Sequence, residues 1–131
     1  MVKKIDHIAI VVKDLKKAAK AYTEMFGFKE VEKMEGPGGE FTSMMLSAGD
    51  IRVELFQPIK EGSFKRFLDE KGGGLHHVSF LTDDIAKEVK TLKAQGKKLQ
   101  NEEPFQLPGA KIVFVHPSAA ENVLIELVER K

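Results

Sequence analysis

The chain has 131 residues, the size of one ordinary domain, and 42% of them are hydrophobic, enough to bury a core. Its 21 Lys and Arg residues against 20 Asp and Glu residues leave a formal net charge of +1, which provides no whole-molecule field to attract nucleic acid or an anionic membrane. The absence of cysteine excludes disulfides and thiolate metal sites and fits a reducing compartment. No stretch is long and apolar enough to span a bilayer, and charged residues interrupt the apolar run near the N-terminus, so we expect a cytoplasmic protein.

The first half of the chain predicts a β-α-β-β-β module. Residues 5–12 are rich in β-branched side chains, and Asp14 then begins an amphipathic helix that ends at Gly27. Three further strands are expected, at Lys29–Glu35, Phe41–Ser47 and Arg52–Gln57, with a glycine-rich turn at 36–39. Residues 63–70 predict a short linking helix, which three glycines at 72–74 end.

The second half repeats this pattern. Residues 75–82 resemble residues 5–12, with a His at the same place, and an amphipathic helix follows from Asp83/Asp84 to Gly96. The later strands are expected at Lys98–Glu102, Lys111–His116 and Val123–Val128, with a turn at 107–109. The sequence therefore predicts an α+β fold in one domain, with tandem modules at about residues 4–60 and 74–130 joined by a helix at about 63–71.

Two histidines and two glutamates recur at matched places in the two modules. His7 and His77 are 70 positions apart, and Glu54 and Glu126 are 72 positions apart. Alternation along a strand places His7 on the face opposite Ile8 and Ile10, and it places His77 with Ser79. The glutamates interrupt apolar strands, where an uncompensated carboxylate is costly. If a pseudo-twofold axis relates the modules, two imidazoles and two carboxylates make a mixed N/O site for a divalent metal, with two octahedral positions left for a chelating substrate.

Other readings of these residues remain open at this stage. A lone His on a strand is usually structural, and a lone Glu often faces solvent; the repeated placement favours the metal site. His76 alternates away from His77 and corresponds to Asp6, so we expect local hydrogen bonds there. His116 either lines a pocket or satisfies a turn, and Met44 and Met45 suit a pocket wall or core better than a metal site.

These features resemble the vicinal oxygen chelate (glyoxalase/bleomycin resistance/dioxygenase) superfamily and, within it, the methylmalonyl-CoA epimerases. The double His before an apolar strand and the stretch GAKIVFVHP at Gly109–Pro117 are fairly specific to the epimerases. The resemblance extends over nearly the whole chain; its other matching stretches are Ile5–Val12, Arg52–Pro58, Phe67–Phe80, Glu102–Pro104 and Val123–Glu129.

The resemblance implies a curved, half-open mixed sheet around one divalent ion, which the sequence does not identify among Co, Mn, Ni, Zn and Mg. The ligands carried over are His7, Glu54, His77 and Glu126. In several family members Gln takes the position of Glu54, and either side chain can bind the metal. The resemblance further implies an acyl-CoA substrate and a homodimer, without nucleic-acid or membrane partners.

The chain departs from the epimerase pattern in three places. Residues 118–122 replace the usual Lys-Ser and Gly pair, and the turn at 107–109 is reduced. Both lie on loops expected to meet the acyl group or CoA, so they concern the substrate rather than the metal. Thr42 takes the third-strand position where some epimerases carry a second glutamate base. We expect Thr42, Lys111 and His116 to contact the substrate.

The implied reaction removes a proton α to a thioester and returns it on the other face, which needs a base on each side. We assign Glu126 as one base and Glu54 as the other, with Glu40 a weaker alternative. A glyoxalase-I-like lactoylglutathione lyase is the main rival enzyme, since it moves a proton similarly on a hemithioacetal. A metal-free antibiotic-binding protein is the rival outside enzymes, although such proteins tend to lack the ligand set. Fold alone decides none of these.

Overall fold

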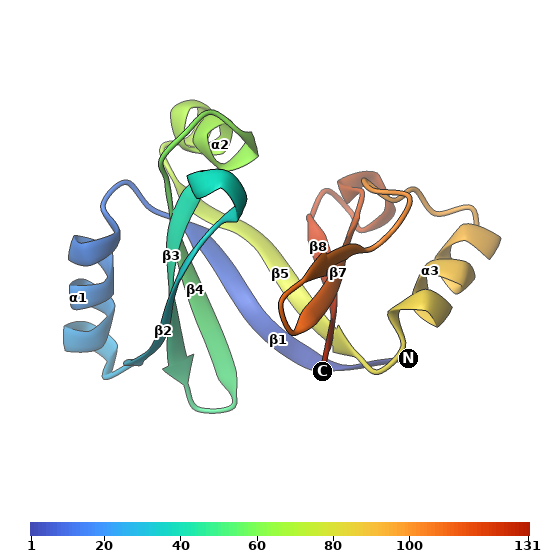
Figure 1. Ribbon diagram of the computed structural model, residues 1–131, viewed down its shortest axis with the longest axis horizontal. Coiled ribbons are helices and arrows are strands. Elements are labelled where there is room, and N and C mark those ends of the chain that lie inside the picture. The colour runs from blue at the N-terminus through green and yellow to red at the C-terminus, as the bar shows by residue number, and fades with distance from the viewer. The chain divides into compact units, whose positions relative to one another are not determined.

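The computed structural model describes residues 1–131, which form two compact units (Figure 1). The central unit comprises His7–His76, and the terminal unit comprises Met1–Asp6 together with His77–Lys131. Eight strands form one mixed sheet in the order β2-β3-β4-β1-β5-β8-β7-β6, and three α-helices accompany them. The predicted α+β class with a mixed sheet is confirmed. None of the helices combines the length and apolar character needed to cross a membrane.

The central unit contains the first module and the helix that follows it. Its elements are β1 (Val2–Val11, of which residues 7–11 belong here), α1 (Leu15–Phe26), β2 (Lys29–Glu35), a 3-10 turn (Pro37–Gly39), β3 (Phe41–Ala48), β4 (Ile51–Pro58) and α2 (Ser63–Lys71). β1 runs parallel to β4, whereas β3 is antiparallel to both β2 and β4. The predicted helices and strands of this module are confirmed; the last three strands agree to within one residue at each end, whereas β1 begins at Val2, three residues before the expected start.

Helix α1 covers one face of the strands of the central unit (Figure 1). It begins where the Asp14 carboxylate accepts a hydrogen bond from the Lys17 amide, and it ends at Gly27, whose φ of 72° is left-handed. Its buried side chains pack on alternate residues of β3 and β4; the core they form is Leu15, Ala19, Leu46, Val53 and Leu55. Alternation then leaves the neighbouring residues of those strands on the opposite face.

The opposite face of the central unit carries an aromatic core beneath α2. Ala9, Val11 and Phe56 are buried there against side chains of α2. The rings of Phe56 and Phe64 stack at 4.6 Å, and Phe41 meets both edge-on at 5.0 and 5.1 Å. This aromatic core fixes α2 over one end of the face that carries His7 and Glu54.

The terminal unit contains the second module. Its elements are β5 (Gly74–Thr82, of which residues 77–82 belong here), α3 (Ile85–Ala94), β6 (Phe105–Leu107), β7 (Ala110–Val115), a 3-10 turn (Pro117–Ala119) and β8 (Ile125–Arg130). β5 runs parallel to β8, and β7 is antiparallel to β8 and β6. Helix α3 packs on one strand face; the core there is Ile85, Val89, Leu99, Val113, Val115 and Leu127.

Three ion pairs join the N-terminal residues to the rest of the terminal unit. The N-terminal ammonium lies 2.9 Å from Glu88, and Lys3 lies 2.8 Å from Asp83. Arg130 donates two hydrogen bonds, at 2.9 and 2.7 Å, to the two carboxylate oxygens of Asp6, whose side chain is buried. A bidentate pair of this kind fixes both position and direction, so the start of β1 is held against the end of β8.

Two predicted strands of the second module need correction. The strand expected at Lys98–Glu102 is absent: only Leu99 forms a bridge, to Val115, and the short strand β6 lies later, at Phe105–Leu107. The Asn101 side chain bonds the amide of Phe114 and the carbonyl of Glu103, both at 2.8 Å, and such local bonds compete with a strand ladder. The last strand begins at Ile125 rather than Val123, because Glu121 and Asn122 adopt positive φ in a turn.

Candidate metal and proton-transfer site

His7 and Glu54 lie together on neighbouring parallel strands of the central unit. In the register of β1 with β4, Ala9 faces Glu54 and His7 faces Arg52, so His7 is diagonal to the carboxylate. His7 Nε2 is 3.6 Å from Glu54 Oε1, and both side chains are buried. The Glu54 carboxylate accepts a hydrogen bond of 2.9 Å from Ser43 on β3. A buried carboxylate in an apolar strand is thereby compensated, as the sequence requires.

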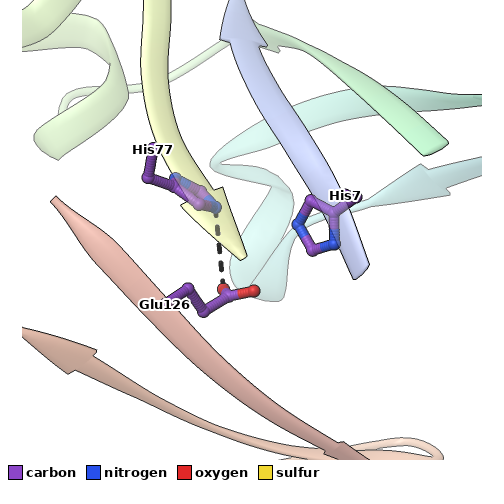
Figure 2. A group of neighbouring side chains, drawn as sticks. All are labelled: His7, His77 and Glu126. Atoms are coloured by element: carbon purple, nitrogen blue, oxygen red, sulfur yellow. Dashed lines mark ion pairs between the residues drawn. The ribbon is translucent and has the colours of Figure 1, made fainter. Parts of the chain in front are cut away.

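His77 and Glu126 form the corresponding pair in the terminal unit. Figure 2 shows His77 on β5 with its imidazole directed at the Glu126 carboxylate on β8. Nε2 of His77 is 3.8 Å from Oε2 of Glu126, and both residues are buried. Ser79 lies opposite Glu126 in the parallel register and donates a hydrogen bond of 2.7 Å to Oε1. The rings of Phe114 and His77 meet edge to face, with their centroids 5.3 Å apart.

The donor atoms of each pair are spaced as two ligands of one ion can be. Protein N and O ligands lie about 2.0–2.2 Å from a transition metal, so two of them on one ion are at most roughly 4.4 Å apart. The separations of 3.6 and 3.8 Å fall inside that limit. Each unit offers the same two donor types, one imidazole nitrogen and one carboxylate oxygen. Imidazole with carboxylate suits the divalent ions expected from the sequence.

The neighbouring His76 lies in different surroundings. It belongs to the central unit, where its ring contacts Phe64 at 4.7 Å and Phe67 at 4.9 Å between centroids. Burial among these rings lowers the pKa of His76 to about 4, so the imidazole is neutral at pH 7. Its position follows the alternation expected from sequence, and the local hydrogen bonds expected for it stay a prediction.

Two of the expected substrate contacts have local partners in the terminal unit. His116 caps the turn at Pro117–Ala119, because its Nδ1 accepts a hydrogen bond of 3.0 Å from the Ser118 amide. This supports the turn reading of His116. Lys111 lies 3.9 Å from Glu129, and it shares a strand face with Val113, which packs beneath α3. The structure therefore does not bring Lys111 onto the strand face of Glu126.

Thr42 faces away from the Glu54 carboxylate, and the Glu40 side chain lies at the start of α2. Thr42 alternates with Ser43 along β3, so it occupies the strand face opposite the one that carries Glu54. Glu40 follows the glycine-rich turn, and its side chain packs against Gly62 at the start of α2, where a Cβ would collide with the carboxylate. Its backbone carbonyl accepts hydrogen bonds from Ile59 and Lys60. A role for either residue with substrate stays a prediction.

Ser43 is a residue of the candidate site that sequence reasoning missed. Ser79 was placed on the face of His77, but no role was given to its hydroxyl. Both serines are completely buried. The available signal was a small hydroxyl residue within a predicted strand, which demands a hydrogen-bond partner once it is buried. The strand pairing that supplies the partner is not visible in the sequence of one strand.

Comparisons with known proteins agree on one superfamily. A family model for the glyoxalase/bleomycin resistance protein/dioxygenase superfamily matches residues 6–128. The uncharacterized protein YqjC of Bacillus subtilis is 32% identical over 98% of this chain and 93% of its own length. The mitochondrial methylmalonyl-CoA epimerase of Mus musculus is 31% identical over 95% of this chain and 71% of its own length.

A solved structure gives the same result for the fold. A variant of the methylmalonyl-CoA epimerase of Streptomyces coelicolor, in complex with 2-nitronate-propionyl-CoA, superposes with a TM-score of 0.91 at 27% identity. The match covers 99% of this chain and 96% of that one. Sequence and structure thus agree along nearly the whole chain, which belongs to the glyoxalase/bleomycin resistance protein/dioxygenase superfamily.

Proposed function

We propose that this protein is a metal-dependent epimerase that inverts C2 of methylmalonyl-CoA. The observation that carries the proposal is the buried His–Glu pair in each unit, with donor atoms spaced as two ligands of one ion can be. The similarity to epimerases, one of them solved with an acyl-CoA analogue, supports the substrate class. The uncharacterized relative at comparable identity makes a direct test of the activity necessary.

The proposed ligands are His7, Glu54, His77 and Glu126. Their donor chemistry fits a divalent ion such as Co, Mn, Ni, Zn or Mg. When bound, the ion supplies positive charge beside the thioester oxygen and so stabilises the negative charge that develops there. Every member of the set is buried, which strengthens that electrostatic effect by excluding water.

The protein's own contribution to the reaction is proton transfer. We assign Glu126 as the base that takes the C2 proton; the electron pair of the broken C–H bond moves toward the thioester oxygen. Glu54 is then the acid that returns a proton to the opposite face of C2, and the two residues exchange roles in the reverse direction. The reaction is balanced because one C–H bond breaks and one forms; Glu126 ends protonated and Glu54 ionised, and proton exchange with water restores both. No electron acceptor or further substrate is needed.

Deuterium exchange tests this function directly. The protein is loaded with Co²⁺ and given (2R)- or (2S)-methylmalonyl-CoA in D₂O, with a sample treated with EDTA as the control. We expect deuterium at C2 together with inversion, and loss of both after chelation. Turnover of a glutathione hemithioacetal without exchange in methylmalonyl-CoA would favour the lactoylglutathione lyase reaction. Turnover of neither compound would contradict an enzyme of either kind.

A further inference from the structure

Each of the two buried glutamates is held by the hydroxyl of one completely buried serine. Ser43 Oγ lies 2.9 Å from Glu54 Oε2, and Ser79 Oγ lies 2.7 Å from Glu126 Oε1. Both serines have no exposed surface. A buried hydroxyl is costly unless it is hydrogen-bonded, and an alanine would fill either position without that cost. The recurrence of serine beside each carboxylate therefore indicates that each carboxylate requires a hydrogen-bond donor.

The two serines do not occupy equivalent positions in the repeat. Ser79 faces Glu126 across parallel strands, and the residue that faces Glu54 in the same way is Ala9. Ser43 faces the residue two places after Glu54 across antiparallel strands, and the corresponding residue in the terminal unit is Ile112. Each unit thus takes its hydroxyl from a different strand. Duplication of one ancestral serine does not explain this arrangement, whereas a shared demand for a donor at each carboxylate does.

The two oxygens of each carboxylate have different neighbours, and the arrangement is the same in both units. In the central unit, one oxygen of Glu54 bonds Ser43 and the other faces Nε2 of His7 at 3.6 Å. In the terminal unit, one oxygen of Glu126 bonds Ser79 and the other faces Nε2 of His77 at 3.8 Å. A carboxylate with one oxygen anchored cannot rotate freely about its terminal torsion. The serine therefore determines which oxygen lies beside the imidazole.

We propose that Ser43 and Ser79 are positioning residues, which anchor one oxygen of Glu54 and Glu126 so that only the other binds the metal. The inference rests on the metal site of the proposed function and adds the groups that orient its carboxylates. Hydrogen bonds from residues behind a ligand commonly change metal affinity 10- to 100-fold. Removing either hydroxyl should also let the freed oxygen approach the ion, which changes the coordination geometry.

The experiment measures Co²⁺ binding by calorimetry and the visible absorption spectrum of the bound ion. Ser43→Ala and Ser79→Ala are compared with wild type and with Ser47→Ala, a matched serine on the same strand as Ser43 that is only partly buried. We expect the Kd for Co²⁺ to rise at least about 10-fold in each of the first two variants, with a changed Co²⁺ spectrum, and neither effect in Ser47→Ala.

A relocated hydroxyl separates positioning from packing. In Ser43→Ala combined with Ala9→Ser, the central unit receives its hydroxyl from β1, as the terminal unit does from β5. We expect this variant to recover part of the lost Co²⁺ affinity and to regain the wild-type spectrum. Ser79→Ala combined with Ile112→Ser makes the reciprocal transfer, so one of the two pairs suffices if the other does not fold.

The outcomes distinguish this inference from the proposed function. Wild-type affinity and spectrum in both alanine variants would overturn the positioning role while leaving the metal site intact. Equal weakening in Ser47→Ala would likewise overturn it, since the effect would then be general. Absence of Co²⁺ binding by wild type itself would overturn the proposed metal site, and the inference with it.

Discussion

The two units present the same carboxylate–imidazole pair but surround it differently. Gln57 in the central unit and Glu129 in the terminal unit lie 72 positions apart, and each side chain accepts the first amide of a helix, from Leu15 and Ile85 respectively. These helix contacts are therefore repeated along with Glu54 and Glu126. The aromatic core under α2 is a feature of the central unit, whereas the core of the terminal unit is built largely of aliphatic side chains.

This difference shows which contacts the repeat preserves. Contacts that position a strand against its helix recur at matched positions, because each module must bury the same helix face. A serine hydroxyl donates a hydrogen bond to the carboxylate in both units, but the two serines come from strands that do not correspond in the repeat. The rest of each strand face that carries the pair is free to differ. This asymmetry suits the proposed reaction, in which an asymmetric substrate needs one base on each face of C2.

The largest expected effect comes from replacing the two glutamates separately. Glu126→Gln should lower epimerisation about 10²- to 10⁴-fold, the usual contribution of a general base, and should remove deuterium exchange from the epimer whose proton it takes. Glu54→Gln should block inversion by a similar factor but leave that single-face exchange, because Glu126 is intact. The measurement is deuterium content and configuration at C2 by NMR.

The same two variants can contradict the assignment of Glu126 and Glu54 as the two bases. Wild-type epimerisation by Glu54→Gln would remove Glu54 as the second base while leaving it as a ligand, since an amide oxygen can still bind the ion. Wild-type epimerisation by Glu126→Gln would remove Glu126 from the mechanism. Urea unfolding of both variants checks that the fold survives.

The aromatic core of the central unit should give the next largest effect. Phe56 is buried against Phe41 and Phe64, so Phe56→Ala should lower the free energy of unfolding by about 3–5 kcal/mol, through lost burial and the cavity left behind. The control is Phe105→Ala, at a phenylalanine of the terminal unit that is 52% exposed, where we expect a change within about 0.5 kcal/mol. Equal effects in urea unfolding would contradict the importance of this core.

The modules, their helices and the shared strand faces of His and Glu were accessible from sequence because they depend on local signals. Asp14 and Asp84 each cap a helix through an amide three residues on, at 3.0 Å, as their positions before apolar periodic segments predict. The position of β6 was not accessible, because Asn101 bonds a residue 13 positions away. The Ser43–Glu54 bond likewise depends on the register between two strands, which neither strand specifies alone.

The Arg130–Asp6 pair should matter more than the other ion pairs of the N-terminal residues. Asp6→Ala leaves the guanidinium without its bidentate partner, and we expect a loss of about 1–2 kcal/mol in the free energy of unfolding, reduced because Arg130 is partly exposed. Lys3→Ala removes an exposed pair and should change it by less than about 0.5 kcal/mol. Urea unfolding at low and high salt compares them, and similar losses in the two variants would contradict a special role for Asp6.

The smallest expected effect concerns Lys111. Its ammonium lies 3.9 Å from Glu129, the residue that also accepts the Ile85 amide, so the lysine partly neutralises a carboxylate placed at a helix start. The side chain is 39% exposed, and solvent screening limits the stability change for Lys111→Ala to about 0.5 kcal/mol. A role in binding CoA predicts something different. It requires a higher KM for methylmalonyl-CoA than for a thioester without the adenine-phosphate portion, most clearly at low salt. We expect only the small change in stability, with both KM values unchanged, because the strand face of Lys111 is the one that packs beneath α3. A selective rise in KM for the full substrate would instead restore Lys111 as a substrate contact and show that its pairing with Glu129 is exchanged for the CoA phosphates on binding.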